Sequence, residues 1–128
     1  MIFLDSTFIL ALIFKDQVKH QRAKELSKLI AHESKVINNT IIMEVLNSIR
    51  PHHQFDSTKI LNLLLGVDEV HYLTHEEHIS AEKMFKYYNY AINYQDCMIL
   101  KTMQNFQTNR IVTFDSDFKK INGLDIVE

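Results

Sequence analysis

The stretch that decides the fold is Met1-Ile2-Phe3-Leu4-Asp5, four bulky apolar residues followed by a carboxylate. An apolar run without polar alternation is typical of a strand buried on both faces, as in the centre of a parallel sheet. Residues 6–14 then supply a hydroxyl suited to an N-cap at Ser6 and a strongly apolar helix. Ligands of open α/β sheets bind outside the carboxyl ends of the strands, so Asp5 is predicted to lie at a functional edge.

The rest of the chain alternates short apolar runs with helical patterns. Further strands are predicted at residues 35–38, 70–73, 110–114 and 124–127, and helices at 20–32, 41–50, 57–65, 75–86 and 94–106. The N-cap signals are Asn39-Thr40, Asp56-Ser57 and a capping box formed by Thr74 and Glu77. Strands that alternate with helices predict a mostly parallel sheet with helices on both faces, in one domain over residues 1–128.

Composition is that of an ordinary globular protein. The 128 residues are 46% hydrophobic and 23% charged. A formal net charge of -2 gives no long-range attraction for nucleic acid, so an RNA partner would need a local patch. The single cysteine, Cys97, excludes an internal disulfide. The apolar run at 8–14 is too short to span a bilayer and lacks signal-peptide features, so we expect a cytoplasmic protein without a membrane partner.

Four acids are predicted to meet at one edge of the sheet. Asp5 and Asp115 follow strand ends, and Glu44 and Asp96 lie in the first turns of helices that begin at that edge. Singly, most have a structural interpretation as turn residues or as charges that favour a helix N-terminus. Together they would repel one another and raise one another's pKa values. A divalent cation would remove that penalty, and oxygen ligands select Mg²⁺ or Mn²⁺ over zinc.

Two other clusters have structural interpretations that we prefer. His71, His75 and His78 have the spacing of metal ligands, but they divide between a strand and a helix start. Cys97 alone does not complete a zinc site. The tyrosines between residues 87 and 94 could stack RNA bases, yet such residues more often form core or a subunit interface.

At the four acids the chain resembles a known family, the PIN domains, and within it the small toxin ribonucleases of VapC type. Four motifs carry the resemblance: Phe3-Leu4-Asp5-Ser6-Thr7-Phe8, Thr40-Ile41-Ile42-Met43-Glu44-Val45-Leu46, Ile92-Asn93-Tyr94-Gln95-Asp96-Cys97-Met98 and Ile111-Val112-Thr113-Phe114-Asp115-Ser116-Asp117-Phe118. The third departs most, because the family has small alanines after its acid where Cys97 and Met98 stand here. The resemblance implies a PIN-like three-layer α/β/α sandwich with a mostly parallel sheet.

The resemblance also implies a Mg²⁺- or Mn²⁺-dependent endoribonuclease that needs no covalent nucleophile. The catalytic metal ligands it implies are Asp5, Glu44, Asp96 and Asp115. Ser6 and Thr113 are assigned to orienting carboxylates, water or phosphate, with helix capping as the alternative for Ser6. Asp117 is a weaker supporting candidate, because it lies beyond the motif acid and has an alternative role as an exposed turn residue.

The partners implied are an RNA substrate and an antitoxin, since VapC-type proteins are toxins of type II toxin-antitoxin pairs. Residues 63–65 and the tyrosines at 87–94 give more apolar surface than helices that cover one face of a sheet need. This excess predicts a homodimer. The alternatives are a PIN nuclease of RNA processing and a catalytically silent PIN-like binding module. A phosphoacceptor receiver domain is disfavoured, because its paired acid after the first strand and its lysine after the fifth are missing.

Overall fold

The centre of the molecule is a five-stranded parallel sheet, in a computed structural model that describes residues 1–128. The strands are β1 (Ile2–Leu4), β2 (Lys35–Asn38), β3 (Glu69–His71), β4 (Arg110–Val112) and β5 (Asp125–Val127). Their order across the sheet is β3-β2-β1-β4-β5, and every neighbouring pair is parallel. All of β1 is buried between β2 and β4, which confirms the prediction of a central strand.

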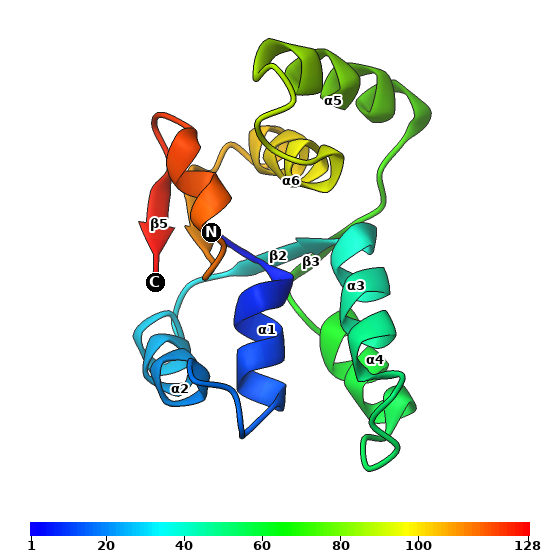
Figure 1. Cartoon of the computed structure of the whole chain (residues 1–128), viewed down its shortest axis with the longest axis vertical. Coiled ribbons are helices and arrows are strands. Elements are labelled where there is room, and N and C mark those ends of the chain that lie inside the picture. The colour runs from blue at the N-terminus through cyan, green and yellow to red at the C-terminus, as the bar shows by residue number, and fades with distance from the viewer.

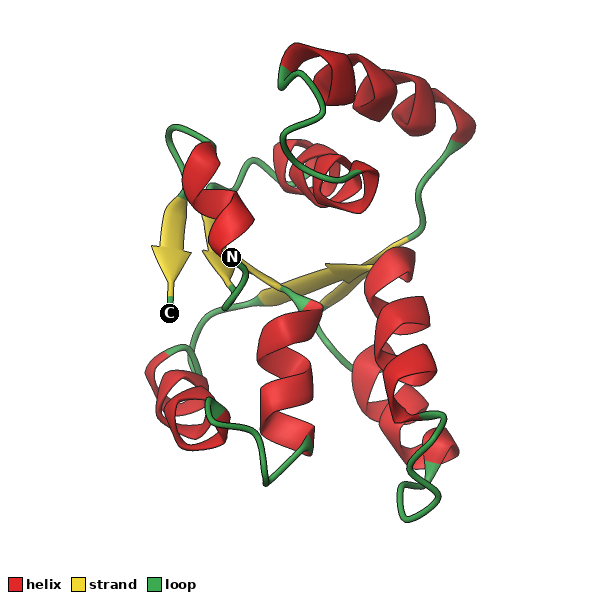
Figure 2. Cartoon of the chain, in the orientation of Figure 1, coloured by secondary structure: helices red, strands yellow, loops and turns green.

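Helices cover both faces of the sheet (Figure 1). One layer contains α1 (Ser6–Ile13), α2 (His20–Leu29), α3 (Asn39–Ile49) and α4 (Ser57–Leu65), and the other contains α5 (His75–Tyr87) and α6 (Tyr94–Asn105). A short 3-10 helix, η1 (Ser116–Lys120), precedes β5. Figure 2 shows the strands between the two helical layers, so the three-layer α/β/α prediction is confirmed. None of these helices combines the length and the apolar character needed to cross a bilayer.

One cluster of 27 buried hydrophobic residues joins the layers. Helix α6 is buried on most of its sides, because it lies between the sheet and α5. Cys97 and Met98, the bulky residues that depart from the family pattern, are 0% and 1% exposed. The core therefore accommodates both side chains directly after Asp96.

Two helices begin earlier than the sequence predicts. Helix α1 starts at Ser6 with Asp5 in the N-cap position and without a side-chain cap, so the prediction of Ser6 as N-cap is wrong. The cap of α3 is Asn38, which also ends β2, and not Asn39-Thr40. In both cases the strand runs into the helix without a connecting loop, which leaves no room for a separate cap. The predicted caps at Asp56 and Thr74 are confirmed.

Strands β3 and β4 end earlier than predicted, because side chains capture backbone N–H groups beyond their ends. The Leu73 N–H donates to Asn39 Oδ1 at 3.1 Å after β3. The Phe114 N–H donates to Thr7 Oγ1 at 2.9 Å after β4. Both segments thus turn away from the sheet at its carboxyl edge, where the acids gather.

Asn38 joins three elements from a fully buried position, at 0% exposure. Its Oδ1 accepts from the backbone N–H groups of Thr40 and Ile41 at 3.1 and 3.3 Å, which caps α3. Its Nδ2 donates to Thr102 Oγ1 on α6 at 3.0 Å. One side chain at the end of β2 therefore fixes the first turn of α3 relative to α6.

We expect Asn38→Ala to lower the free energy of unfolding by about 3 kcal/mol. The cap contributes about 1 kcal/mol, and loss of the Nδ2 donor leaves the acceptor side of the buried Thr102 hydroxyl unpaired at a cost of about 1–3 kcal/mol, while that hydroxyl still donates to the Met98 carbonyl. Urea unfolding followed by circular dichroism measures the loss. Asp56→Ala is the matched control, since Asp56 caps α4 at the exposed surface and should cost only about 1 kcal/mol. Equal losses would show that the buried bond to α6 contributes nothing.

Candidate functional site

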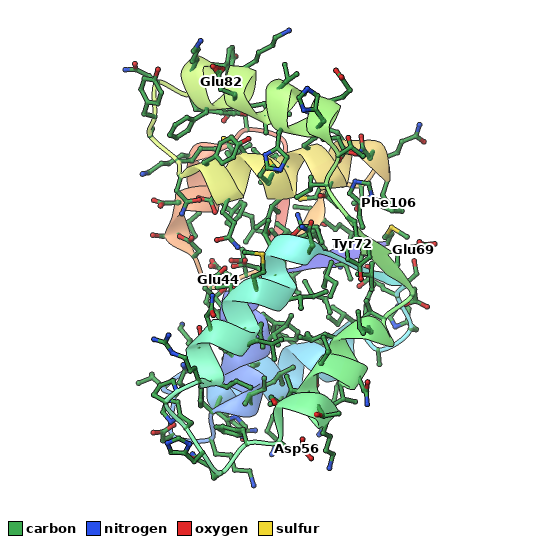
Figure 3. All side chains as sticks on the ribbon, turned by 90° about the vertical axis from the view of Figure 1, so that its right-hand side faces the viewer. Glu44, Asp56, Glu69, Tyr72, Glu82 and Phe106 are labelled. Carbon is green, nitrogen blue, oxygen red and sulfur yellow. The ribbon has the colours of Figure 1, made fainter.

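The acids predicted from the sequence converge at the carboxyl edge of β1 and β4. Asp5 directly follows β1, Asp115 lies just beyond β4, and Asp96 lies in the first turn of α6. Glu44 comes from α3, and Figure 3 labels it at the level where α3 approaches α6. The charge of Glu44 acts on Asp5, and the charges of Asp115 and Asp5 act on Asp96. Each of the four thus acts on at least one other, although the carboxylates of Asp5 and Glu44 lie outside the closest group of acids, which contains Asp96 and Asp115.

Asp5 is locked between β1 and β4 by two threonine hydroxyls. Its Oδ2 accepts from Thr7 Oγ1 at 2.7 Å and from Thr113 Oγ1 at 2.6 Å. Thr7 Oγ1 in turn accepts from the Phe114 N–H, and Thr113 Oγ1 accepts from the Asp115 N–H at 3.0 Å. Each hydroxyl gives its one proton to Asp5 and uses a lone pair for the backbone. The two threonine hydroxyls, each of which is itself held by a backbone N–H, thus fix the orientation of the Asp5 carboxylate.

Burial raises the pKa of Asp5, which is 4% exposed. The hydrogen bonds from Thr113 and Thr7 oppose this rise because they favour the charged form, and the nearby charge of Glu44 adds to it. Ser6 is 2% exposed, and its backbone N–H also opposes the rise in the pKa of Asp5. The Thr113 hydroxyl contacts Asp5, whereas an orienting role for the Ser6 hydroxyl stays a prediction.

Asp96 carries a strongly perturbed carboxyl group. Its backbone N–H donates to Asn93 Oδ1 at 2.8 Å, which fixes the first turn of α6. Burial raises the pKa of Asp96 to about 7, together with the charges of Asp115, Asp5 and Asp117, while a backbone hydrogen bond at Asn93 opposes the rise. Its Oδ2 is buried and has no hydrogen-bond partner. A buried oxygen without a partner is rare in proteins, and this one has lone pairs free to bind a cation.

Asp117 joins this cluster, although the sequence treated it as a weaker candidate. Carboxylate oxygens of Asp96, Asp115 and Asp117 all lie within 4.8 Å of one another. Asp117 also has the turn role that the sequence offered, because its N–H donates to Asp115 Oδ1 at 2.9 Å at the start of η1. Its carboxylate forms an ion pair with Lys120 at 2.8 Å.

The site carries an excess of negative charge. Of the seven ion pairs in the chain, only the one between Lys120 and Asp117 involves an acid of this site. The donors are carboxylate oxygens, and one of them is buried without a partner. A hard divalent cation is the ligand that such donors fit, because it satisfies the oxygens and relieves their repulsion.

Two contacts of the site are absent from the sequence-based set. Thr7 holds Asp5, and Gln95 donates from Nε2 to Glu44 Oε2 at 2.5 Å. The signal for Thr7 was a hydroxyl two residues after the acid, at the start of a helix. Gln95 adjoins Asp96, but only the approach of the start of α6 to α3 at the sheet edge brings it to Glu44.

The histidines lie away from the acids in contacts of their own. His71 Nε2 pairs with Glu77 Oε2 at 2.6 Å, and its ring packs edge-on against Phe106. His78 Nδ1 lies 2.9 Å from the Tyr94 hydroxyl. These contacts hold α5 to β3 and α6.

A sequence model of the PIN domain matches residues 2–124. The chain belongs to the PIN domain family. The whole chain superposes on VapC20 from Mycobacterium tuberculosis, described as a sarcin-ricin loop cleaving toxin, with a TM-score of 0.83, 20% identity and 99% of that chain covered. It also superposes on a chain of a toxin-antitoxin complex from Klebsiella pneumoniae, with a TM-score of 0.75, 19% identity and 97% of that chain covered. No curated protein matches the sequence. At these identities the likeness shows a shared fold, and the predicted PIN-like fold is confirmed.

The raised pKa of Asp96 predicts a pH-dependent stability for this PIN domain without metal. The carboxyl group titrates at its ordinary value of 3.8 in the unfolded chain and at about 7 in the fold, so the folded state holds the proton more tightly. The Asp96 carboxyl group therefore favours the folded state at low pH, and this contribution to the free energy of unfolding is lost as the pH rises from 3.8 to above about 7. We expect the gain in melting temperature of Asp96→Asn over wild type to be small near pH 4 and to grow up to about pH 8. Thermal melts in EDTA measure this difference, and a difference that is constant with pH contradicts the assignment.

Proposed function

We propose that this PIN domain is a Mg²⁺- or Mn²⁺-dependent endoribonuclease and the toxin of a type II toxin-antitoxin pair. The observation that carries the proposal is the acid cluster at the sheet edge, which has Lys120 as its one ion-pair partner and contains a buried Asp96 oxygen that lacks a partner. Similarity to a toxin that cleaves the sarcin-ricin loop supports the nuclease class. Similarity to a toxin-antitoxin complex supports the toxin role.

The residues of the chain would hold the cation and leave no need for a covalent nucleophile. Asp5, Glu44, Asp96 and Asp115 are the proposed ligands, with Asp117 beside them. A bound Mg²⁺ would activate a water and stabilise the charge of an in-line phosphoryl transition state. Thr7 and Thr113 keep Asp5 in one orientation, and the Asn93 cap keeps Asp96 in the first turn of α6. The ligands are thereby positioned before substrate arrives, which reduces the cost of organising the site.

The alternatives are a non-toxin PIN nuclease of RNA processing and a silent PIN-like module. A silent module has no need for acids, whereas this chain has an acid in each of the four motifs. Keeping buried like charges together destabilises a fold, so their retention favours an enzyme. A small antitoxin reading frame next to the gene would favour the toxin over the processing nuclease.

We expect Asp5→Asn, Glu44→Gln, Asp96→Asn and Asp115→Asn each to lower RNA cleavage by orders of magnitude. The amides keep the size of the side chain but remove the charge on which cation affinity and water activation depend. Each variant should still fold, because repulsion within the cluster is relieved. Purified protein is assayed on single-stranded and looped RNA with Mg²⁺ or Mn²⁺, and EDTA serves as the blank.

His75→Ala is the matched control, since His75 is exposed at the start of α5 and should cut as wild type does. The structure changes our expectation for Asp117, which the sequence made a weaker supporting candidate with a turn role as the alternative. Asp117→Asn should weaken cleavage, but less than Asp96→Asn, because Lys120 already neutralises part of its charge. Wild-type cleavage by Asp96→Asn, or cleavage that persists in EDTA, would rule out the metal mechanism.

We also propose that the protein is cytoplasmic, forms a homodimer and binds an antitoxin. Large apolar side chains lie exposed on two helices: Tyr87 is 81% exposed on α5, and Leu63 is 67% exposed on α4. Exposed apolar surface of this kind marks protein interfaces. Light scattering at micromolar concentration should therefore give the mass of a dimer, and a monomer mass would contradict this part of the proposal.

A further inference from the structure

Glu44 has a single side-chain partner, and that partner is neutral. Gln95, the residue before Asp96 on α6, donates from Nε2 to Glu44 Oε2 at 2.5 Å. No lysine, arginine or histidine forms an ion pair with Glu44. The other proposed ligands come from β1, β4 and α6, so this amide is the direct link between them and the one acid on α3.

Gln95 belongs to a line of hydrogen-bonded polar side chains along the seam between α3 and α6. Its Nε2 lies 3.5 Å from Thr40 Oγ1, which donates to Asn38 Oδ1 at 2.6 Å. Asn38 in turn donates to Thr102 on α6. Two contacts therefore join α3 and α6: a buried one between Asn38 and Thr102, and a half-buried one between Gln95 and Glu44. The buried contact holds the helices together, whereas the half-buried contact orients the Glu44 carboxylate.

An open groove of about 490 Å³ runs beside this contact, and Glu44, Gln95 and Met43 line it. Met43 is 61% exposed, so the contact is reachable from solvent on this side. A half-buried carboxylate on an open groove would sample several rotamers if no neighbour held it. The Gln95 amide selects one of them.

An amide is the chemistry that this position requires. A lysine or arginine in its place would also orient Glu44, but it would neutralise the charge and compete with a cation for the oxygens. A carboxylate has about four lone-pair sites, so one bond from a neutral donor leaves the charge and most of the lone pairs free. Gln95 can therefore hold Glu44 and leave it able to bind metal.

We propose that Gln95 is a positioning residue that holds Glu44 toward Asp5 and Asp96, so that α3 contributes its acid to the metal site. This inference rests on the function proposed above. Gln95 acts through Glu44 and is not itself a ligand or a catalytic residue.

The test measures Mn²⁺ binding to the full chain by titration calorimetry. Gln95→Met keeps the length of the side chain and removes the donor, and we expect it to raise the Kd for Mn²⁺ about tenfold, the usual effect of losing a residue that orients a ligand. Gln104→Met is the matched control, since Gln104 is exposed near the other end of α6 and should bind Mn²⁺ as wild type does. Gln95→Lys keeps length and donor but adds a positive charge, so it should also weaken Mn²⁺ binding.

Cleavage supplies a second readout that a purely structural role would not move. At low Mn²⁺ Gln95→Met should cut RNA about tenfold more slowly, and saturating Mn²⁺ should restore the wild-type rate, because the loss lies in metal affinity. A wild-type Kd in Gln95→Met or, if that variant does not fold, in Gln95→Lys would overturn the inference. So would a slow rate that excess Mn²⁺ does not restore. Wild-type protein that binds Mn²⁺ but cuts no RNA would instead overturn the proposed function, while the binding measurements would still decide the role of Gln95.

Discussion

The hydrogen bonds from Thr7 and Thr113 to Asp5 join the start of the chain to its fourth strand, and the acidic edge depends on them. They form because β1 and β4 pair in a register that sets Leu4 beside Val112, so the next residues, Asp5 and Thr113, are neighbours. Asp115 follows two residues later, and its N–H is held by the same Thr113 hydroxyl. A shift of one residue in this register would turn Thr113 to the opposite face and leave Thr7 as the only hydroxyl that donates to the buried Asp5 carboxylate.

The acid cluster is an arrangement that the fold alone would not favour. Burial and neighbouring charges raise the pKa values of Asp5 and Asp96, so the charged forms of both are disfavoured in the folded protein. The surrounding structure tolerates this strain because a core of 27 buried hydrophobic residues, centred on β1 and α6, supplies the opposing stability. The same side chains, Asp5 and Asp96, thus lower the stability of the metal-free protein and supply the charges that would bind a cation.

The seam between α3 and α6 shows how the fold divides structural and functional work. Asn38 is fully buried and bonds to the backbone of α3 and to Thr102, so it sets where α3 begins relative to α6. Gln95 lies nearer the surface and bonds to a carboxylate that is free to act. Hydrogen bonds of the first kind stabilise a fold because burial makes their loss costly, whereas the second kind mainly limits the rotamers of one side chain.

The sequence by itself determined the order of strands and helices, the central position of β1, the acids at its carboxyl edge and the PIN family. It could do so because apolar runs, helical spacing and cap residues are local patterns, and because a parallel sheet brings strand ends and helix starts to one edge. Some local details were beyond it: Ser6 is not the cap of α1, and Asn38 rather than Asn39-Thr40 caps α3. Only the tertiary structure decided that Thr113 holds Asp5, that Asp117 joins Asp96 and Asp115, and that Gln95 reaches Glu44. Each of these contacts links segments that approach one another only through strand register and helix packing. The spacing of residues along the chain predicts neither the register nor the packing.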